Sequence, residues 1–83
     1  MGELSRMPNI GKIGEESLLK AGIESPDELL ALGSKEAFLR IRLVEPDACL
    51  HKLYALEGAV QNVKKSELPK ETKKELKDFF NSL

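Results

Sequence analysis

The sequence predicts an all-α fold, a compact bundle of five or six short helices that includes a helix-hairpin-helix-like element. Signals for β-strands are nearly absent, because the chain has no alternating run of β-branched residues and no Asn-Gly or Asp-Gly turn. Signals that start and stop helices recur along the chain, and the apolar residues between them repeat at helical spacing. The 83 residues are enough for one domain, spanning 1–83.

The N-terminal part is expected to contain a single turn, a tight hairpin and a short helix. The turn runs from about Glu3 to Met7 and ends before Pro8. The helix runs from about Lys12 to Ala21, and Gly22 supplies the left-handed residue at its exit. The inward residues are expected to be Ile10, Ile13, Leu18 and Ala21, and the outward residues Glu15, Glu16 and Lys20.

The middle of the chain predicts two short helices separated by Gly33. The first begins at the segment 25–28, where serine, proline and glutamate occupy the positions of a capping box. The second is expected over about 35–44, with Ser34 as its cap and Pro46 as its stop. The expected inward residues are Leu29, Leu30, Leu32, Ala37, Phe38, Ile41 and Val44.

Two amphipathic helices complete the prediction, over about 47–63 and from Pro69 onward. A glycine inside a helix costs about 1 kcal/mol relative to alanine, so Gly58 indicates the close approach of a neighbouring helix. Glu57 is expected to accept a backbone N–H of the hairpin or to pair with a lysine. The apolar faces comprise Cys49, Leu50, Leu53, Tyr54, Leu56, Ala59, Val60 and Val63 in the first helix, and Leu68, Thr72, Leu76, Phe79, Phe80 and Leu83 in the second.

Composition and charge exclude several classes of protein. The 13 basic and 14 acidic residues give a net charge of −1, so no overall field draws the chain to DNA or to an anionic membrane. Cys49 is the only cysteine, which excludes an intramolecular disulfide and fits a reducing cytoplasm. No signal-peptide pattern is present and no apolar run approaches about 18 residues. We therefore expect a cytoplasmic protein without a membrane span.

The glycine hairpin is the strongest candidate site. Gly11 and Gly14 leave backbone N–H groups uncovered at a helix start, with Lys12 between them, so the hairpin can hold a phosphate or a carboxylate. A structural interpretation competes, because glycines also allow a sharp turn with apolar residues packed beneath it. Glu15 and Glu16 favour the structural interpretation, since each would repel a phosphate by about 1–2 kcal/mol. The predicted partner- or phosphate-binding residues are Asn9, Gly11, Lys12, Gly14, Glu15 and Glu16.

A run of lysines near the C-terminus is a second candidate. Acidic residues interleave with the lysines at helical spacing, so one interpretation is a solvated face whose charges neutralise locally. The other interpretation is a weak phosphate-facing patch, without the alternating aromatic residues that stack bases. The residues of this basic patch are Lys64, Lys65, Lys73 and Lys77.

Catalytic and metal chemistry find little support in the sequence. His51 is the only histidine and lies four residues after Asp47, a spacing typical of a surface ion pair rather than a general base with its orienting partner. Cys49 and His51 point to different sides of a helix, so they cannot share a metal ion. Cys49 is expected to pack as a small apolar residue. We predict no enzyme, no catalytic residue, no metal site and no cofactor.

Five features occur in a fixed order: the hairpin with Asn9, the Gly22-Ile23 exit, the Leu30-Ala31-Leu32-Gly33 step, the Leu53-Tyr54-Ala55-Leu56-Glu57-Gly58-Ala59 run and the Leu68-Pro69 helix start. Together they resemble the C-terminal domain of the TfoX/Sxy bacterial competence regulators, from about Pro8 to Leu76. The resemblance implies a small helical domain with a helix-hairpin-helix-like element, no catalytic residues and a role in switching on genes for DNA uptake. Those regulators generally carry a separate N-terminal domain, so this chain is expected to be a stand-alone copy of the C-terminal half.

Three hypotheses for function follow. The first is a non-enzymatic bacterial domain that acts in transcriptional regulation by contacting a protein partner through the hairpin and the acidic start of the following helix. The second is direct, weak binding to a DNA backbone through the same hairpin and the basic patch. The third is a homodimer formed through apolar surface near Phe79, Phe80 and Leu83.

Overall fold

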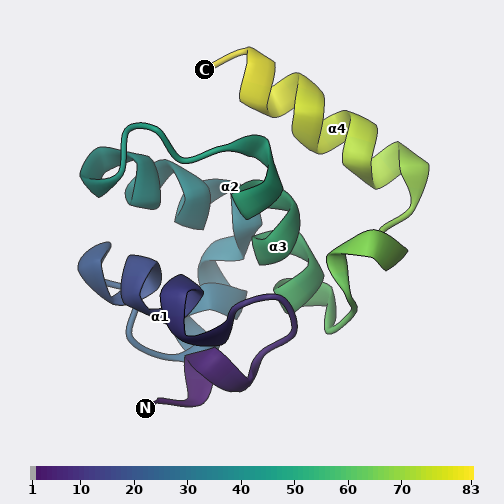
Figure 1. Ribbon diagram of the computed structural model, residues 1–83. Coiled ribbons are helices and arrows are strands. Elements are labelled where there is room, and N and C mark those ends of the chain that lie inside the picture. Colours follow the sequence, from purple (N-terminus) through teal and green to yellow (C-terminus); the bar gives the residue numbers. More distant parts are fainter. Residues whose placement is uncertain (1) are drawn as a thin grey trace.

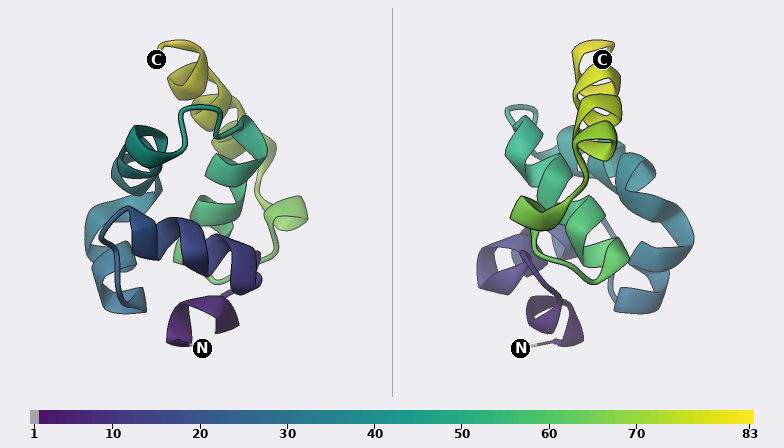
Figure 2. Two further views of the ribbon diagram at one scale, coloured as in Figure 1. Left: turned by 60° about the vertical axis from the view of Figure 1, so that its left-hand side comes forward. Right: turned by 90° about the vertical axis from the view of Figure 1, so that its right-hand side faces the viewer.

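Four α-helices and two 3₁₀ turns make up the part of the chain that the computed structural model describes, residues 2–83 (Figure 1). The all-α prediction is confirmed, whereas the predicted count of five or six helices is wrong. The two termini lie at opposite ends of the molecule (Figures 1 and 2). The elements are η1 (Glu3–Arg6), α1 (Gly11–Lys20), α2 (Pro26–Val44), α3 (Leu50–Gln61), η2 (Lys65–Glu67) and α4 (Lys70–Asn81).

The helix count differs because α2 continues through Gly33, where two separate helices were predicted. Gly33 has φ 81° and ψ 167°, so the helical path is interrupted there by a kink. Such a positive φ favours glycine over any residue with a side chain. The local signal for a break is therefore correct, although the helix resumes directly after the kink.

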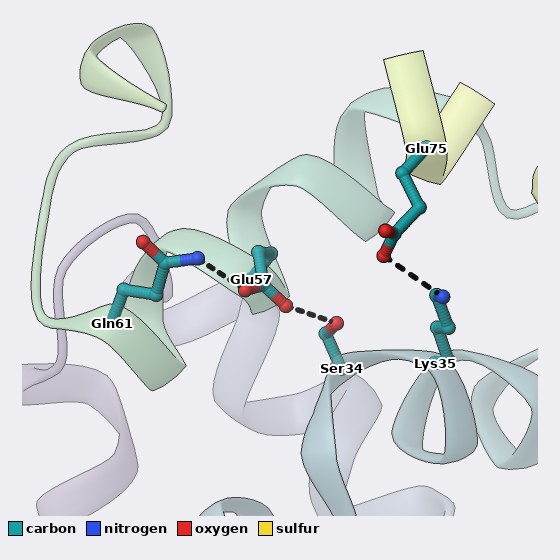
Figure 3. Close-up of polar contacts among 5 residues, drawn as sticks. All are labelled: Ser34, Lys35, Glu57, Gln61 and Glu75. Atoms are coloured by element: carbon teal, nitrogen blue, oxygen red, sulfur yellow. Dashed lines mark hydrogen bonds and ion pairs between the residues drawn. The ribbon is translucent and has the colours of Figure 1, made fainter. Parts of the chain in front are cut away.

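Ser34, directly after the kink, links α2 to α3 (Figure 3). Its buried hydroxyl donates a 2.5 Å hydrogen bond to Glu57 Oε1, rather than capping a helix start. Gln61 donates to the other oxygen of the same carboxylate. The expectation that Glu57 pairs with the hairpin or with a lysine is therefore wrong, because a serine and a glutamine occupy both of its oxygens.

Two helix ends with local sequence signals form as predicted, the start of α2 and the end of α1. The Ser25 hydroxyl accepts the backbone N–H of Glu28 at 3.2 Å, with Pro26 at the first helical position. Gly22 has φ 83° and ends α1, and the N–H of Ile23 donates to the carbonyl of Leu18 at 2.9 Å. This bond closes a Schellman motif, which satisfies a carbonyl that the helix itself leaves free.

One apolar core joins α1, α2, α3 and the start of α4. Its members are Leu4, Ile10, Leu18, Ile23, Leu29, Ala37, Phe38, Ile41, Leu53, Leu56, Ala59, Leu68 and Leu76. Several residues predicted to face inward are instead exposed, because no neighbouring element covers their side of the helix. They are Ile13, Leu30, Val44, Cys49 and Leu83.

The last helix, α4, packs on the core through its aromatic residues. The Phe80 ring lies 5.8 Å from the Phe38 ring, centroid to centroid. The Lys35 ammonium lies 5.5 Å above the Phe79 ring and 3.1 Å from Glu75, which joins α2 to α4 (Figure 3). Phe79 and Phe80 are therefore half-buried within the molecule, and Leu83 is the exposed member of the proposed dimer surface.

Within residues 2–83, no helix has the length and apolar character needed to cross a membrane.

Candidate functional site

The hairpin before α1 is built from two left-handed residues around a buried isoleucine. Asn9 has φ 69° and Gly11 has φ 59°, while Ile10 between them is helical and buried. The first α-helical bond runs from the Gly14 N–H to the Ile10 carbonyl at 3.0 Å. A Cβ on Gly14 would lie 3.0 Å from Ile10 Cγ2, so the small residue lets Ile10 pack beneath the turn. The two glycines thus have different roles: Gly11 allows the left-handed backbone conformation, and Gly14 leaves room for the Ile10 side chain.

The start of α1 leaves backbone N–H groups free. Within residues 2–83, no backbone or side-chain acceptor receives the N–H groups of Gly11, Lys12 or Ile13. These groups point along the positive end of the helix dipole, which favours a carboxylate or a phosphate. The hairpin therefore keeps the property for which it is a candidate site.

Asn9 fixes the hairpin to the segment that follows α3. Its Nδ2 donates to the Val63 carbonyl at 2.9 Å, and its Oδ1 accepts the backbone N–H of Lys65 at 2.9 Å. Gly58 makes room for this contact, because a Cβ there would lie 2.8 Å from the Val63 oxygen and would also collide with Asn9 Nδ2. The predicted close approach at Gly58 exists, but the neighbour is this side chain and loop rather than a helix. Asn9 positions the hairpin.

The two acidic residues of the predicted site behave differently from each other. Glu15 is buried, and its carboxylate accepts the backbone N–H groups of Gly2 at 3.2 Å and Ser5 at 3.1 Å. It therefore holds the start of η1 against α1, and the prediction that it faces outward is wrong. Glu16 is exposed as predicted. Of the two, Glu16 is the one exposed to a partner.

A cleft of about 230 Å³ opens between the hairpin and α3. We call it the hairpin cleft. It is smaller than the roughly 300–1,000 Å³ pockets that hold drug-sized ligands, so it suits one or two side chains of a partner. Ile13 stands at this cleft with 76% of its surface exposed. The lining residues are Asn9, Ile10, Ile13, Gly14 and Ser17 on one side, Cys49, His51, Lys52, Ala55 and Leu56 on the other, with Ile41 and Lys65.

A polar link closes one part of this cleft and joins three helices. The Lys52 ammonium donates to the Ser17 hydroxyl at 2.8 Å and to Glu45 Oε1 at 3.0 Å. The Ser17 hydroxyl and the Lys52 ammonium together hold the pKa of the Glu45 carboxyl below its ordinary value. Sequence reasoning missed this link. The signal available was Lys52 itself, a lysine that interrupts the apolar run of α3.

The four residues of the predicted basic patch fall on two elements. Lys64 and Lys65 lie at η2, whereas Lys73 and Lys77 lie on α4. Within residues 2–83, none of the four forms an ion pair, and Glu75 binds Lys35 of α2 instead of a lysine on its own helix. Acidic and basic residues still alternate along α4, without an ion pair between two residues of this helix among residues 2–83. Of the four, Lys65 lines the hairpin cleft.

His51 and Cys49 lie at the opposite end of the cleft from the hairpin turn. Asp47 precedes α3 in a turn and makes no ion pair with His51, whose ring packs edge-on against Tyr54 at 6.1 Å. The predicted Asp47–His51 pair is therefore wrong, because α3 begins only at Leu50. Cys49 is exposed rather than packed. Among residues 2–83, no three His, Cys, Asp or Glu side chains gather as a metal site would require.

Two crystal structures of Listeria monocytogenes proteins are similar to this chain. One, of an uncharacterized protein in a triclinic form, is 53% identical with a TM-score of 0.93, and the match covers 95% of this chain and 90% of that one. The other, a tetragonal form of a protein of unknown function, is 53% identical with a TM-score of 0.92, covering 95% of this chain and 98% of that one. No match is found among curated proteins.

The family profile described as the TfoX C-terminal domain matches residues 1–80. This match spans the hairpin, the kinked α2, the apolar α3 and nearly all of α4. The resemblance seen in the sequence is thereby confirmed, and the chain belongs to the TfoX C-terminal domain family.

Proposed function

We propose that this chain is a non-enzymatic regulatory domain that acts in transcriptional regulation by binding a protein partner at the hairpin cleft. Membership of the TfoX C-terminal domain family supports a role of the regulatory kind. The candidate contact surface is the cleft together with the exposed hairpin residues Lys12 and Glu16. The predicted residue Glu15 does not belong to this surface, because its carboxylate accepts hydrogen bonds from the backbone of Gly2 and Ser5.

The exposure of Ile13 carries this proposal. An isoleucine in the first turn of a helix, 76% exposed beside an apolar cleft, contributes nothing to the core of its own domain. Covering such a side chain with a partner is worth about 1.5–3 kcal/mol. The cleft provides apolar walls at Ala55 and Leu56 against which a partner side chain packs next to Ile13.

Direct binding to a DNA backbone is a second candidate. It is favoured by the free N–H groups at Gly11, Lys12 and Ile13, which present a positive helix end to solvent. Lys12 and Lys65 are exposed nearby. With a net charge of −1, such binding rests on a few local contacts and weakens with added salt in proportion to their number.

Site-specific cross-linking in the native cell distinguishes the two candidates. A photoreactive amino acid replaces Ile13 in one variant and Leu43 in a control, since Leu43 is 84% exposed but lies outside the cleft. The proposal predicts a discrete protein adduct, unaffected by nuclease, at position 13 and not at position 43. A nuclease-sensitive adduct would favour DNA, and an adduct of two copies would favour a homodimer. Equal labelling at both positions, or none at position 13, would contradict a partner at the cleft.

A further inference from the structure

We infer that the hairpin cleft receives an acidic segment of a protein partner, with an apolar side chain against Ile13 and a carboxylate beside Lys65. This inference rests on the proposed function and specifies the chemistry of the partner. Two properties of the cleft carry it, an apolar interior and a cationic border. The apolar interior comes from buried side chains of the core, and the cationic border comes from lysines near the ends of the cleft-lining segments.

The interior of the cleft selects an apolar side chain. Ile10, Ile41 and Leu56 line it and are nearly fully buried. The volume of about 230 Å³ matches a side chain rather than a cofactor. Ile13 projects beside this opening with most of its surface in water. An apolar residue of a partner that fills the cleft removes mainly the Ile13 surface from water, because the other apolar lining residues named here are already buried.

The charged border of the cleft selects a carboxylate. Its basic lining residues are His51, Lys52 and Lys65, and no aspartate or glutamate lines it. The Lys52 ammonium is already occupied by Ser17 and Glu45. Lys65 makes no ion pair within the described residues, yet its backbone N–H is held by Asn9 at 2.9 Å. Its ammonium is therefore a free charge whose backbone is anchored at the cleft.

A peptide fits these properties better than a nucleic acid does. A phosphodiester backbone carries a charge at every nucleotide, whereas only one lining lysine, Lys65, is without an ion pair or a side-chain hydrogen bond among residues 2–83. Grooves that bind single-stranded nucleic acid also present aromatic side chains for base stacking, and the lining of this cleft contains no Phe, Tyr or Trp. The apolar interior of the cleft and the single lysine at its border therefore match a peptide segment with one acidic residue next to one apolar residue.

Selection from a random peptide display library on the purified chain tests this inference. Peptides that also bind an Ile13→Asp variant are removed, and the remaining binders are sequenced. One of these binders is then synthesised in two forms, an acidic form with its Asp or Glu and a neutral form with Asn or Gln in that place. Affinities of both peptides are measured for the wild-type chain and for Lys65→Ala. Lys64→Ala is the matched control, because Lys64 is the neighbouring exposed lysine and does not line the cleft.

The selected peptides are expected to share an apolar residue adjacent to Asp or Glu. Lys65→Ala should weaken the acidic peptide about threefold, the range of an exposed ion pair, and leave its neutral form unchanged. Lys64→Ala should change neither. No enrichment, enrichment of basic or uncharged peptides, equal effects of the two lysine variants, or displacement of the peptide by duplex DNA would overturn the inference. Because this selection uses purified protein, it succeeds or fails independently of the cross-linking result in cells.

Discussion

The Asn9 side chain accepts the backbone N–H of Lys65 at 2.9 Å, across 56 residues of sequence. This bond joins the hairpin before α1 to the loop that follows α3. Both ends of the bond line the hairpin cleft, so the contact that holds the hairpin also places Lys65 at the border of the cleft. The geometry of the candidate site therefore depends on Asn9, whose Oδ1 accepts from Lys65 and whose Nδ2 donates to Val63 and Ala55.

Replacing Asn9 tests how much this anchor stabilises the fold. Asn9→Ala removes the two 2.9 Å hydrogen bonds to Val63 and Lys65, worth about 1 kcal/mol each, together with the longer 3.5 Å bond to Ala55. It also places an alanine in a left-handed backbone conformation, which costs about 1–2 kcal/mol. We expect the free energy of unfolding to fall by about 3–4 kcal/mol, measured by urea denaturation followed by circular dichroism. Asn9→Gly keeps the backbone conformation and should lose about 1 kcal/mol less. Equal losses in both variants would show that the positive φ carries no cost.

Gly58→Ala tests the close packing beneath that anchor. In an open helix this change stabilises by about 1 kcal/mol, but here the added Cβ meets the Val63 carbonyl oxygen at 2.8 Å. We expect a net loss of about 1–3 kcal/mol in the same denaturation experiment. In an Asn9→Gly background the loss should become smaller but persist, since the Val63 contact remains. Stabilisation by Gly58→Ala would contradict the described approach.

Glu15 and Glu16 form a matched pair for testing structural against surface roles. Glu15→Ala removes the acceptor of the Gly2 and Ser5 N–H groups, so we expect a loss of about 1–3 kcal/mol and faster hydrogen exchange over residues 2–6. Glu16→Ala changes an exposed residue and should stay within about 0.5 kcal/mol of the wild type. Similar effects of the two changes would rule out a structural role peculiar to Glu15.

Acid should weaken the fold through Glu45. Because Ser17 and Lys52 lower the pKa of its carboxyl in the folded chain from the ordinary 4.5, its contribution is present above that pH and disappears as the pH falls below it. Unfolding free energies measured from about pH 7 to pH 3 should therefore fall more steeply for the wild type than for Glu45→Gln. Parallel pH profiles would mean that the carboxylate adds no stability.

Local features of the fold were predictable from the sequence. The Ser25 cap and the Gly22 exit each depend on hydrogen bonds between residues at most five positions apart, so the local sequence is enough to predict them. The conformation of Gly33 was predictable for the same reason. Whether the helix resumes after Gly33 depends on packing against α3, which is why one kinked helix replaced two.

Features that depend on distant contacts were not predictable in the same way. Periodicity assigns Ile13 to an apolar face, but its burial depends on whether another element covers that face, and none does. The helical spacing predicts that Glu15 lies on the surface, yet its carboxylate accepts the backbone N–H groups of Ser5 and Gly2, 10 and 13 residues earlier. The far wall of the hairpin cleft comes from α3, brought there by tertiary packing. Sequence reasoning thus located the hairpin but not the cleft beside it.

Transcript profiles of the native cell test most directly whether this domain regulates genes through the hairpin cleft. A strain lacking the protein is complemented with the wild type, with Ile13→Asp or with Leu43→Asp, at matched protein levels. Both changes alter exposed side chains. An aspartate in the first turn of α1 suits the helix dipole, whereas the aspartate in the last turn of α2 opposes it by at most about 1 kcal/mol, so both variants should fold. We expect Leu43→Asp to restore the wild-type profile and Ile13→Asp to fail. Full restoration by Ile13→Asp would contradict the account.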